Sequence, residues 1–409
     1  MRAPTSHPLG EKRKEGMNNM KKRITNVLRG LVVATAAVSL AACGAGSDAA
    51  PAASEPAQEL SPAAQAAQEI VETISQPVGE FTAPGPALEG VADLSGSTVY
   101  YVAATLSVPM FTVIADALEE ALGEAGVSLQ VCDGKANPQS IATCIDQAVQ
   151  ADAGAVISGS VPYELASVAF DSVTKAGIPL LYTQVAPAGP GDPKQVGYLS
   201  PDNVEMQAWM ANWVIADSNA KADVLAVGLS DTPATKLWME QGALATYKEK
   251  CADCKVTFQE INTGQMDKLP SQISSALVAN PGITHIHALA DSLVQPIQQG
   301  LQSAGISPDD VKVISMEGSL AVMQLLADGR FMNAEVGTNL QALGWYSADQ
   351  TLRMMSGQPS VQNLKFPYRM LFSQEATQAL TLTPEAEASG EWYGDASFRE
   401  GFTKLWGLD

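Results

Sequence analysis

The hydrophobic pattern beyond residue 97 alternates between short apolar runs and amphipathic segments. Residues 98–106 (TVYYVAATL) are β-branched and aromatic, as a buried strand requires. In the next segment Phe111, Ile114, Leu118 and Leu122 recur at helical spacing. This strand–helix alternation predicts parallel sheets covered by helices on both faces. It extends over about 310 residues, which is too long for one sheet of ordinary size, so we expect two lobes.

The N-terminal region has the pattern of an export signal. A basic segment, 21–29 (KKRITNVLR), precedes the weakly polar run 30–42, which is too short to span a bilayer. Residues 40–43 (LAAC) resemble a bacterial lipobox, and this resemblance implies that Cys43 is lipidated and begins the mature chain. The alternative is an ordinary cleaved signal with a chance cysteine. We predict a lipoprotein signal peptide in residues 1–42, with translation starting at Met1, Met17 or Met20.

Residues 43–96 consist mainly of Ala, Pro, Ser, Glu and Gln. Such a segment has too few large apolar side chains to build a core, so we predict a disordered tether. Within it, residues 61–75 have the pattern of a short helix, with Ser61 as N-cap and Pro62 in the first turn. The tether would hold an exported protein at the outer face of the cytoplasmic membrane through its lipid anchor.

The charge of the chain argues against one class of partner. The sequence has 24 Lys+Arg and 44 Asp+Glu. Residues 1–42 contain eight of the basic and two of the acidic residues, so 16 basic and 42 acidic residues remain, a net charge of −26. Binding to nucleic acid relies on Lys and Arg against phosphate, so we expect no nucleic-acid partner.

Apart from Cys43, four cysteines remain, and an even number in an exported chain suggests disulfides. Three pairings are possible, and we favour the two local ones, Cys132–Cys144 and Cys251–Cys254. The CADC segment could instead be a redox or zinc motif. A zinc site needs further Cys or His ligands. A redox CxxC normally opens a helix after a strand, whereas this one lies between an expected helix and an expected strand.

Motifs for catalysis are missing from the sequence. It contains no phosphate-binding loop, no G-x-S-x-G, no H-E-x-x-H, and no G-x-G-x-x-G after the first expected strand. His285 and His287 share one face of an expected strand and have Asp291 nearby, so a metal site is one interpretation. Two histidines under a covering helix is the other, and we favour it. We therefore predict no metal, no cofactor and no enzymatic activity.

Several segments, in their order and spacing, resemble one family. They include 102–126 (VAATLSVPMFTVIADALEEALGEAG), 133–157, 287–306 and 342–358. These resemble the ribose/galactose-type substrate-binding proteins of ABC importers, over roughly residues 97–370. The resemblance implies an α/β fold of two doubly wound parallel-sheet lobes, joined by a three-segment hinge, that close on a ligand. It places lobe 1 at 97–201 plus 339–367 and lobe 2 at 202–338 plus 368–409.

The resemblance also implies ligand contacts, although this sequence departs from the family pattern at most of them. The corresponding positions are Met110, Phe111, Gln184, Trp238, Met266, Asp291, Glu317 and Asn339. A sugar needs many polar partners, because each of its hydroxyl groups that is buried without a hydrogen bond costs about 1–3 kcal/mol. This set has fewer polar groups than such a site requires. It favours a less polar, ring-bearing ligand, oriented by Gln184, Glu317 and Asn339. Glu317 with Asp291 could also favour a cationic ligand over Trp238; alternatively, Met110, Trp238 and Met266 belong to the core.

The function implied is that of a monomeric, lipid-anchored solute-binding protein. It would capture a small molecule outside the membrane and deliver it to the permease and ATPase subunits of an ABC importer. A second hypothesis is a sensory receptor of the same fold that acts on a signalling partner. A third is an exported enzyme that uses the segment THIHALAD or CADC.

Overall fold

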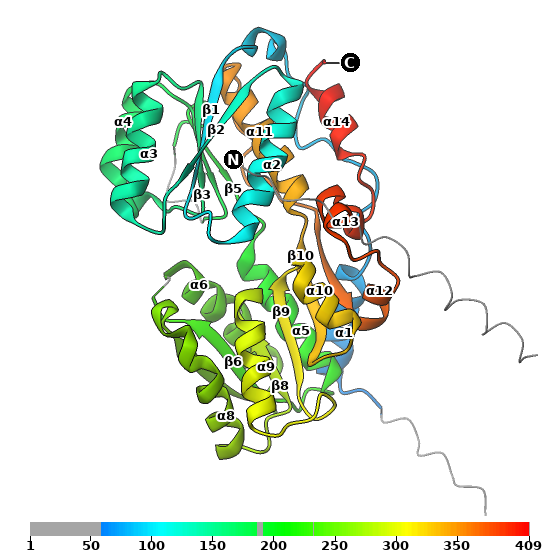
Figure 1. Cartoon of the computed structure of the whole chain (residues 1–409). Coiled ribbons are helices and arrows are strands. Elements are labelled where there is room, and N and C mark those ends of the chain that lie inside the picture. The colour runs from blue at the N-terminus through cyan, green and yellow to red at the C-terminus, as the bar shows by residue number, and fades with distance from the viewer. Residues whose placement is uncertain (1–58, 186–190, 232, 409) are drawn as a thin grey trace, which may run out of the picture. The chain divides into compact units, whose positions relative to one another are not determined.

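Two β-sheets organise the part of the chain that the computed structural model describes, residues 59–185, 191–231 and 233–408 (Figure 1). These residues belong to the unit Gln58–Asp409. The predicted signal peptide and the predicted lipidation site Cys43 lie outside them. No helix in the described ranges has both the length and the apolar character of a membrane span.

The first sheet has five parallel strands in the order β2-β1-β3-β4-β5. Alternate residues of β1 explain why helices cover both of its faces: Val99 and Tyr101 pack in one core cluster and Val102 in another. The strands are β1 Thr98–Ala103, β2 Ser128–Asp133, β3 Ala155–Gly159, β4 Leu180–Thr183 and β5 Val196–Leu199. The covering helices are α2 Pro109–Glu124 and α11 Leu340–Met355 on one face and α3 Pro138–Gln150 and α4 Ser167–Lys175, with the 3-10 turn η2 Tyr163–Leu165, on the other.

The second sheet has six strands in the order β11-β10-β9-β8-β6-β7, and only β11 runs antiparallel to its neighbour. The strands are β6 Asp223–Leu229, β7 Lys255–Ile261, β8 His285–Ala288, β9 Lys312–Glu317, β10 Met332–Thr338 and β11 Arg369–Ser373. Its helices and helical turns are α5 Asn203–Asp217, α6 Pro233–Trp238, η3 Met239–Leu244, α7 Ala245–Lys250, η4 Thr263–Lys268, α8 Leu269–Ala279, η5 Asp291–Leu293, α9 Val294–Ser303 and α10 Leu320–Ala327. The predicted fold of two doubly wound α/β lobes is confirmed.

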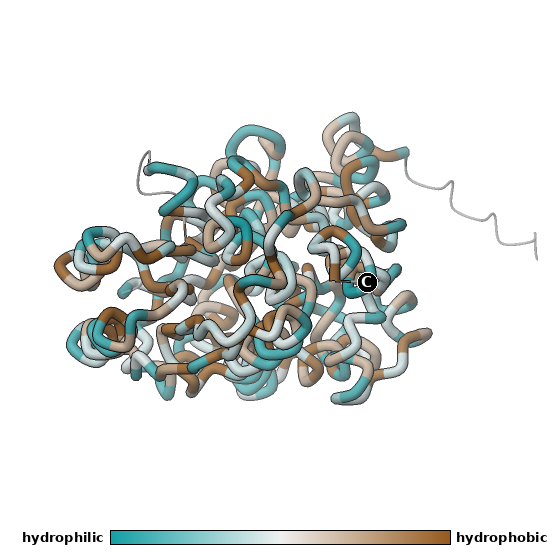
Figure 2. The backbone as a smooth tube through the Cα atoms, turned by 90° about the horizontal axis from the view of Figure 1, so that it is seen from above, coloured by the Kyte–Doolittle hydropathy of each residue, from teal (hydrophilic) through white to brown (hydrophobic). Residues whose placement is uncertain are grey.

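Local sequence signals explain where several helices begin. Asn137 caps α3 by accepting hydrogen bonds from the amides of Gln139 and Ser140, with Pro138 at the first helical position. Along the helices, hydrophobic and hydrophilic stretches alternate, as amphipathic helices on a sheet require (Figure 2). The central strand β3 is buried along its whole length, because helices cover both of its faces.

The chain crosses between the lobes at three places that correspond to the predicted hinge. The first crossing joins β5 to α5, the second joins β10 to α11, and the third joins α11 to β11. In the second and third crossings, the amide of Asn339 donates to the carbonyl of Tyr368 at 2.9 Å. The crossings therefore also bond to one another.

The prediction that residues 43–96 form a disordered tether is wrong for residues 59–96. Helix α1, Pro62–Ile74, begins at its predicted N-cap Ser61 and packs against α5 of the second lobe, with Ala64 and Ala67 buried. The chain then continues through the 3-10 turn η1, Val91–Leu94, to the first lobe. Small side chains let α1 approach α5 closely, so this segment docks although it has no core of its own.

The assignment of all of residues 368–409 to lobe 2 also needs correction. Helices α12 Gln374–Gln378 and α13 Pro384–Ser389 follow β11, but α14 Phe398–Leu405 packs on α11 of the first lobe. Trp406 stacks on Trp345 of α11, with ring centroids 5.6 Å apart. Between α13 and α14, the chain passes from the second lobe back to the first through η6, Glu391–Tyr393. The sequence did not indicate this C-terminal passage.

The N- and C-terminal passages run together, and we call residues 75–91 with 391–405 the terminal brace. Its two segments bond through Val78 and Gly394, which form an isolated β-bridge, and through the amide of Leu88, which donates to the Leu405 carbonyl at 2.8 Å. The rings of Phe81 and Phe402 meet edge to face at 4.8 Å. The lobes are thus linked by more than the three predicted crossings.

Both favoured disulfides are present in the structure. Cys132 of β2 is bonded to Cys144 of α3, and Cys251 is bonded to Cys254 in the turn between α7 and β7. CADC therefore closes a tight turn before a strand, which agrees with the structural interpretation of this segment.

Candidate ligand-binding site

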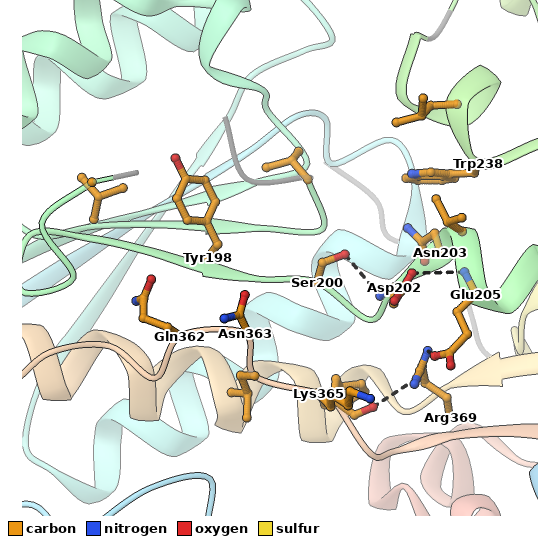
Figure 3. A pocket seen from close by; sticks show the side chains of 17 residues that line it. Tyr198, Ser200, Asp202, Asn203, Glu205, Trp238, Gln362, Asn363, Lys365 and Arg369 are labelled. Carbon is orange, nitrogen blue, oxygen red and sulfur yellow. Dashed lines mark hydrogen bonds and ion pairs between the residues drawn. The ribbon is translucent and has the colours of Figure 1, made fainter. Parts of the chain in front are cut away.

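A cavity lies at the hinge, and we call it the hinge cavity (Figure 3). Its volume is about 590 Å³, which lies within the range of small-molecule sites. Its lining comes from β5 and residues of the β4–β5 connection in the first lobe, from α5 and α6 of the second, and from the first and third crossings. A ligand in this cavity would therefore contact both lobes.

Aromatic side chains form two walls of the hinge cavity. Tyr198 projects from β5 and stacks on the buried ring of Tyr182, with ring centroids 5.3 Å apart. Trp238, the last residue of α6, faces the cavity from the second lobe. Rings held on two sides suit a flat or ring-bearing molecule.

The cations at this cavity differ in how they are used. Arg369 donates to the Pro201 carbonyl at 2.7 Å and pairs with Glu205 at 2.8 Å, and its guanidinium lies 4.5 Å from the centroid of the Trp209 ring. These contacts bind the third crossing to the first and satisfy the guanidinium. Lys365 is exposed, and no ion pair within residues 59–408 involves it. Among the described residues that line the cavity, Lys365 is thus the cation that no ion pair involves.

A second, smaller cavity lies near the second crossing, and its lining includes Glu387 and Tyr393. Three further acidic residues of lobe 2 lie close to one another but do not line this cavity. We call Asp291, Glu317 and Glu335 the acidic cluster. Asp291 accepts hydrogen bonds from the Ser319 amide at 2.9 Å, from the Ser319 hydroxyl at 2.5 Å and from the Ser315 hydroxyl. Glu335, which is 0% exposed, accepts from the Gly318 amide at 2.9 Å through Oε1.

Burial dominates the electrostatics of this cluster. It raises the pKa of Glu335 well above the ordinary glutamate value and also raises the pKa of Asp291. The pKa of Glu317 rises to about 8, first because of burial and second because of the negative charge of Asp291. Among the described residues, no Lys or Arg pairs with any of the three carboxyl groups. The cluster therefore holds protons more tightly than isolated carboxyl groups do.

The structure brings some of the predicted ligand contacts together. Asp291 and Glu317 are neighbours at the ends of adjacent strands, and Trp238 lines the hinge cavity. Gln184 lies next to Val185 of the cavity wall, and its side chain accepts from the Ser160 hydroxyl at 3.1 Å. Its backbone has φ +62°, a left-handed conformation that positions this turn after β4.

Other predicted contacts are placed elsewhere or are already occupied. Phe111 lies in the first turn of α2 and is 5% exposed, because its side chain packs into the core. Asn339 caps α11 by accepting from the Ala342 amide at 3.0 Å and also donates to the Gly390 carbonyl at 3.3 Å. The polar atoms of Asn339 are therefore used within the fold. Met110 and Met266 are partly buried against the core.

Sequence reasoning missed most of the residues that line these two cavities, among them Tyr198, Lys365 and Tyr393, and it also missed Glu335, which lines neither cavity. A signal did exist for Glu335, because it interrupts the apolar run of an expected buried strand (FMNAEVG). Tyr393 belongs to the C-terminal passage, and nothing in the sequence pattern places that segment beside the second crossing.

The two histidines of THIHALAD have separate protein partners. His287 is fully buried between the Tyr247 hydroxyl at 3.1 Å and Gln207 Oε1 at 2.7 Å, and burial lowers its pKa to about 3. His285 contacts Asp217 at 2.9 Å. Within the described ranges no group of three or more His, Cys, Asp or Glu side chains has a metal-binding arrangement.

Comparison with solved structures supports the same architecture. An ABC sugar transporter subunit from Rhodobacter sphaeroides is 20% identical, with a TM-score of 0.60 over 69% of this chain and 99% of that chain. A 5-methylthioribose transporter solute-binding protein from Thermotoga lettingae is 13% identical, with a TM-score of 0.62 over 75% and 96%. An Actinobacillus succinogenes solute-binding protein with bound D-allose is 17% identical, with a TM-score of 0.61 over 69% and 100%.

At these identities the likeness establishes the fold. No curated protein matches the sequence. The model of the periplasmic binding protein domain matches residues 99–359, which is more than half of the chain. The chain therefore belongs to the periplasmic binding protein domain family, whose members bind small ligands outside the cytoplasm as solute-binding components of ABC importers.

Proposed function

We propose that this chain is a lipid-anchored solute-binding protein that captures a small organic molecule between its lobes and delivers it to the permease and ATPase of an ABC importer. Membership of the periplasmic binding protein domain family supports the binding role. The export signal and the lipobox-like residues 40–43 support an anchored protein at the outer face of the cytoplasmic membrane.

The observation that carries this proposal is the hinge cavity. Its walls belong to both lobes, so a bound molecule would contact each of them and stabilise the closed arrangement over the open one. The first and third crossings form its floor, and Arg369 holds these crossings together. Such a cavity couples the presence of a ligand to the relative position of the lobes.

The lining of the hinge cavity supports a ring-bearing ligand that is less polar than a simple hexose. Tyr198 and Trp238 offer flat apolar surface, while Asn203 and Asn363 offer hydrogen-bonding groups near the hinge. The solved structure with 5-methylthioribose has a ligand that combines a sugar with a thioether. We infer that the ligand of this chain is likewise sugar-like or ring-bearing, with a substantial apolar part.

A thermal-shift screen of the mature chain, residues 43–409, tests this proposal. The panel contains simple sugars, thio- and deoxysugars, nucleosides, cyclic alcohols and cyclic amines. A ligand present at 100 times its dissociation constant adds about 2.7 kcal/mol to stability, which is visible as a shift in melting temperature. We expect a clear shift from at least one ring-bearing compound.

Two variants connect such a shift to the hinge cavity. Trp238→Ala should reduce the stabilisation from about 2.7 kcal/mol to about 0.4–1.4 kcal/mol at the same ligand concentration, because the variant removes one aromatic wall and weakens binding. Val278→Ala is the control, since Val278 is 70% exposed on α8 and does not line the cavity. If no class of compound shifts the melting temperature, or if Trp238→Ala binds as the wild type does, the proposed site is wrong.

A further inference from the structure

Several polar side chains that line the hinge cavity already have protein partners. Glu205 pairs with Arg369 at 2.8 Å. The Gln362 amide donates to the Ser360 carbonyl at 3.2 Å and to the Ser360 hydroxyl at 3.0 Å. These groups are used within the fold, so they leave few of the hydrogen bonds that a hydroxyl-rich ligand would need.

Asn203, in contrast, is buried without a partner. It is 9% exposed and lines the hinge cavity, and within residues 59–185, 191–231 and 233–408 no hydrogen bond involves its side chain. Its neighbour Asp202 caps α5 by accepting from the Glu205 amide at 3.1 Å, so the cap does not need Asn203. A carboxamide has two N–H donors and an oxygen acceptor, and burying them unpaired is costly. A ligand in the cavity would supply the missing partners.

The surface beside Asn203 is flat and apolar. Asn203 begins α5 and Trp238 ends α6, and these two helices pack against each other in the second lobe. The carboxamide and the indole therefore belong to the same wall of the hinge cavity (Figure 3). Tyr198, held by its stack on Tyr182, forms the wall of the first lobe. A bound molecule would meet flat rings from both lobes and a donor–acceptor pair beside one of them.

The charges around the cavity favour a neutral ligand. Two acidic side chains, Asp202 and Glu205, and two basic ones, Lys365 and Arg369, are among the described residues that line it, so their formal charges balance. Asp202 and Lys365 are exposed to water, which screens them. The buried and unpartnered polar group is the uncharged Asn203. Recognition at this position therefore depends on the pattern of donors and acceptors in the ligand.

We propose that the ligand of this chain contains a nucleobase-type ring, and that Asn203 recognises its edge. Such a ring is a neutral, planar heterocycle whose edge carries an N–H donor next to an acceptor. The carboxamide oxygen accepts from the N–H of the ring edge, and the carboxamide nitrogen donates to the neighbouring acceptor. Trp238 stacks on the face of the ring. This inference rests on the proposed function, because it assigns a chemical class to the ligand of the same cavity.

Two other classes of ligand fit these observations less well. A hexose carries hydroxyl groups around its whole ring, whereas Glu205 and Gln362 of this cavity are engaged within the protein. A purely apolar ring would displace water from Asn203 and leave its carboxamide unpaired. A nucleobase matches both parts of the wall, since its polar groups lie in the plane of the ring and its faces stack on aromatic side chains.

Matched pairs of nucleosides test this inference by calorimetry on the mature chain, residues 43–409. The probes are uridine against 3-methyluridine, and adenosine against 6-dimethylaminopurine riboside. Each methylated compound keeps the ring but lacks the N–H donor of the edge. We expect at least one parent nucleoside to bind and its methylated partner to bind at least tenfold more weakly, because the buried carboxamide then loses a partner.

Asn203→Ala tests whether this residue makes the discrimination. The ratio of affinities between parent and methylated compound should fall from at least tenfold to less than twofold, whereas a merely structural residue would weaken both compounds equally. The variant should fold, because Asp202 still caps α5 and alanine favours a helix. Gln302→Ala is the matched control, since Gln302 is an exposed carboxamide on α9 outside the hinge cavity and its removal should leave the ratio unchanged. Melting curves check that each variant is folded.

The outcomes separate this inference from the proposed function. If another compound of the screen binds and is weakened by Trp238→Ala, while neither pair of nucleosides shows the expected preference, the solute-binding function stands and the nucleobase assignment is wrong. A ratio that stays at the wild-type value in Asn203→Ala also overturns the assignment. If no compound in the screen or in the calorimetry binds, both proposals fail.

Discussion

The hinge cavity and the acidic cluster differ in how their charged groups are satisfied. At the hinge cavity, Arg369 is paired with Glu205 and bonded to a backbone carbonyl, so its charge is spent on holding two crossings together. In the acidic cluster, which lines neither cavity, Asp291 and Glu335 are buried, and no Lys or Arg among the described residues pairs with them. In the first region the arginine is paired without a ligand and the other cation, Lys365, is exposed to water, whereas the buried carboxyl groups of the second region hold protons more tightly than isolated ones.

This difference separates ligand recognition from pH dependence. A cavity whose charges are already neutralised discriminates ligands by shape and by contact with apolar surface, here that of Tyr198 and Trp238. A buried acidic group without a counter-charge makes stability depend on pH. Variants in one region should therefore leave the properties that belong to the other unchanged.

The largest expected effect is on stability as a function of pH, in the double variant Glu317→Gln/Glu335→Gln. Burial raises the folded-state pKa of both residues, that of Glu317 to about 8. Their contribution to stability is complete below the ordinary pKa of 4.5 and is lost as pH rises through the folded values. Between pH 5 and pH 8.5, the free energy of unfolding should fall by about 2–5 kcal/mol more in the wild type than in the variant.

Urea unfolding at a series of pH values measures this difference. His287 changes the free energy of unfolding in the opposite direction. Its folded-state pKa is lowered to about 3, so its contribution to stability is lost as the pH falls below 6.5. Both proteins contain His287, so its effect cancels in the comparison. Equal pH slopes in the wild type and the variant would contradict the unpaired state of the acidic cluster.

The next largest effect is expected from Trp238→Ala on ligand affinity. Losing one aromatic wall of the hinge cavity should weaken the best ligand of the screen by about 10- to 100-fold, because a large apolar contact is removed. The pH dependence of unfolding should stay that of the wild type. Calorimetry and urea unfolding on the same preparation check both statements, and a changed pH slope would show that the two regions are not independent.

The fold was predictable because helices bury both faces of the central strands, and burial leaves a clear apolar pattern in the sequence. The docking of α1 was not predictable. Ala64 and Ala67 pack against α5 through their small size, and the stability of this helix comes from its neighbour and not from its composition. An Ala-rich segment that docks in this way has the same composition as a tether.

The site was only partly predictable for a related reason. Asn339 has the same sequence context whether it binds a ligand or caps a helix, and here it caps α11. Glu335 gains its environment from the pairing of β10 with β9, which brings it beside Ser315. Tyr393 reaches the small cavity through the C-terminal passage, a tertiary arrangement that no local pattern indicates.

A smaller effect is expected from Arg369→Lys. Lysine keeps the charge, but its single nitrogen cannot replace both Nη1, which donates to the Pro201 carbonyl and pairs with Glu205, and Nε, which donates to the Phe366 carbonyl at 3.0 Å. We expect a loss of about 1–2 kcal/mol in the free energy of unfolding, measured by urea denaturation. Arg330→Lys is the matched control, because Arg330 pairs with Asp328 at 2.7 Å on the surface and should change stability by less than about 0.5 kcal/mol.

The smallest effect on ligand affinity is expected from Lys365→Gln, which tests whether charge contributes to recognition at the hinge cavity. Lys365 is the cation of the hinge cavity that no ion pair occupies within the described residues, yet it is exposed to solvent. Water and salt screen an exposed ammonium, so its removal should change the affinity for a neutral ring-bearing ligand by less than about twofold.

An anionic ligand would respond differently to the same variant. If the best ligand of the screen carries a carboxylate or phosphate, Lys365→Gln should weaken it severalfold at low salt and much less at 0.5 M salt, because screening already removes the interaction there. Calorimetry at two salt concentrations distinguishes the cases. A strong, salt-dependent loss for an anion would make Lys365 the charge-selective group of the molecule. It would also show that the hinge cavity selects its ligand by charge as well as by shape.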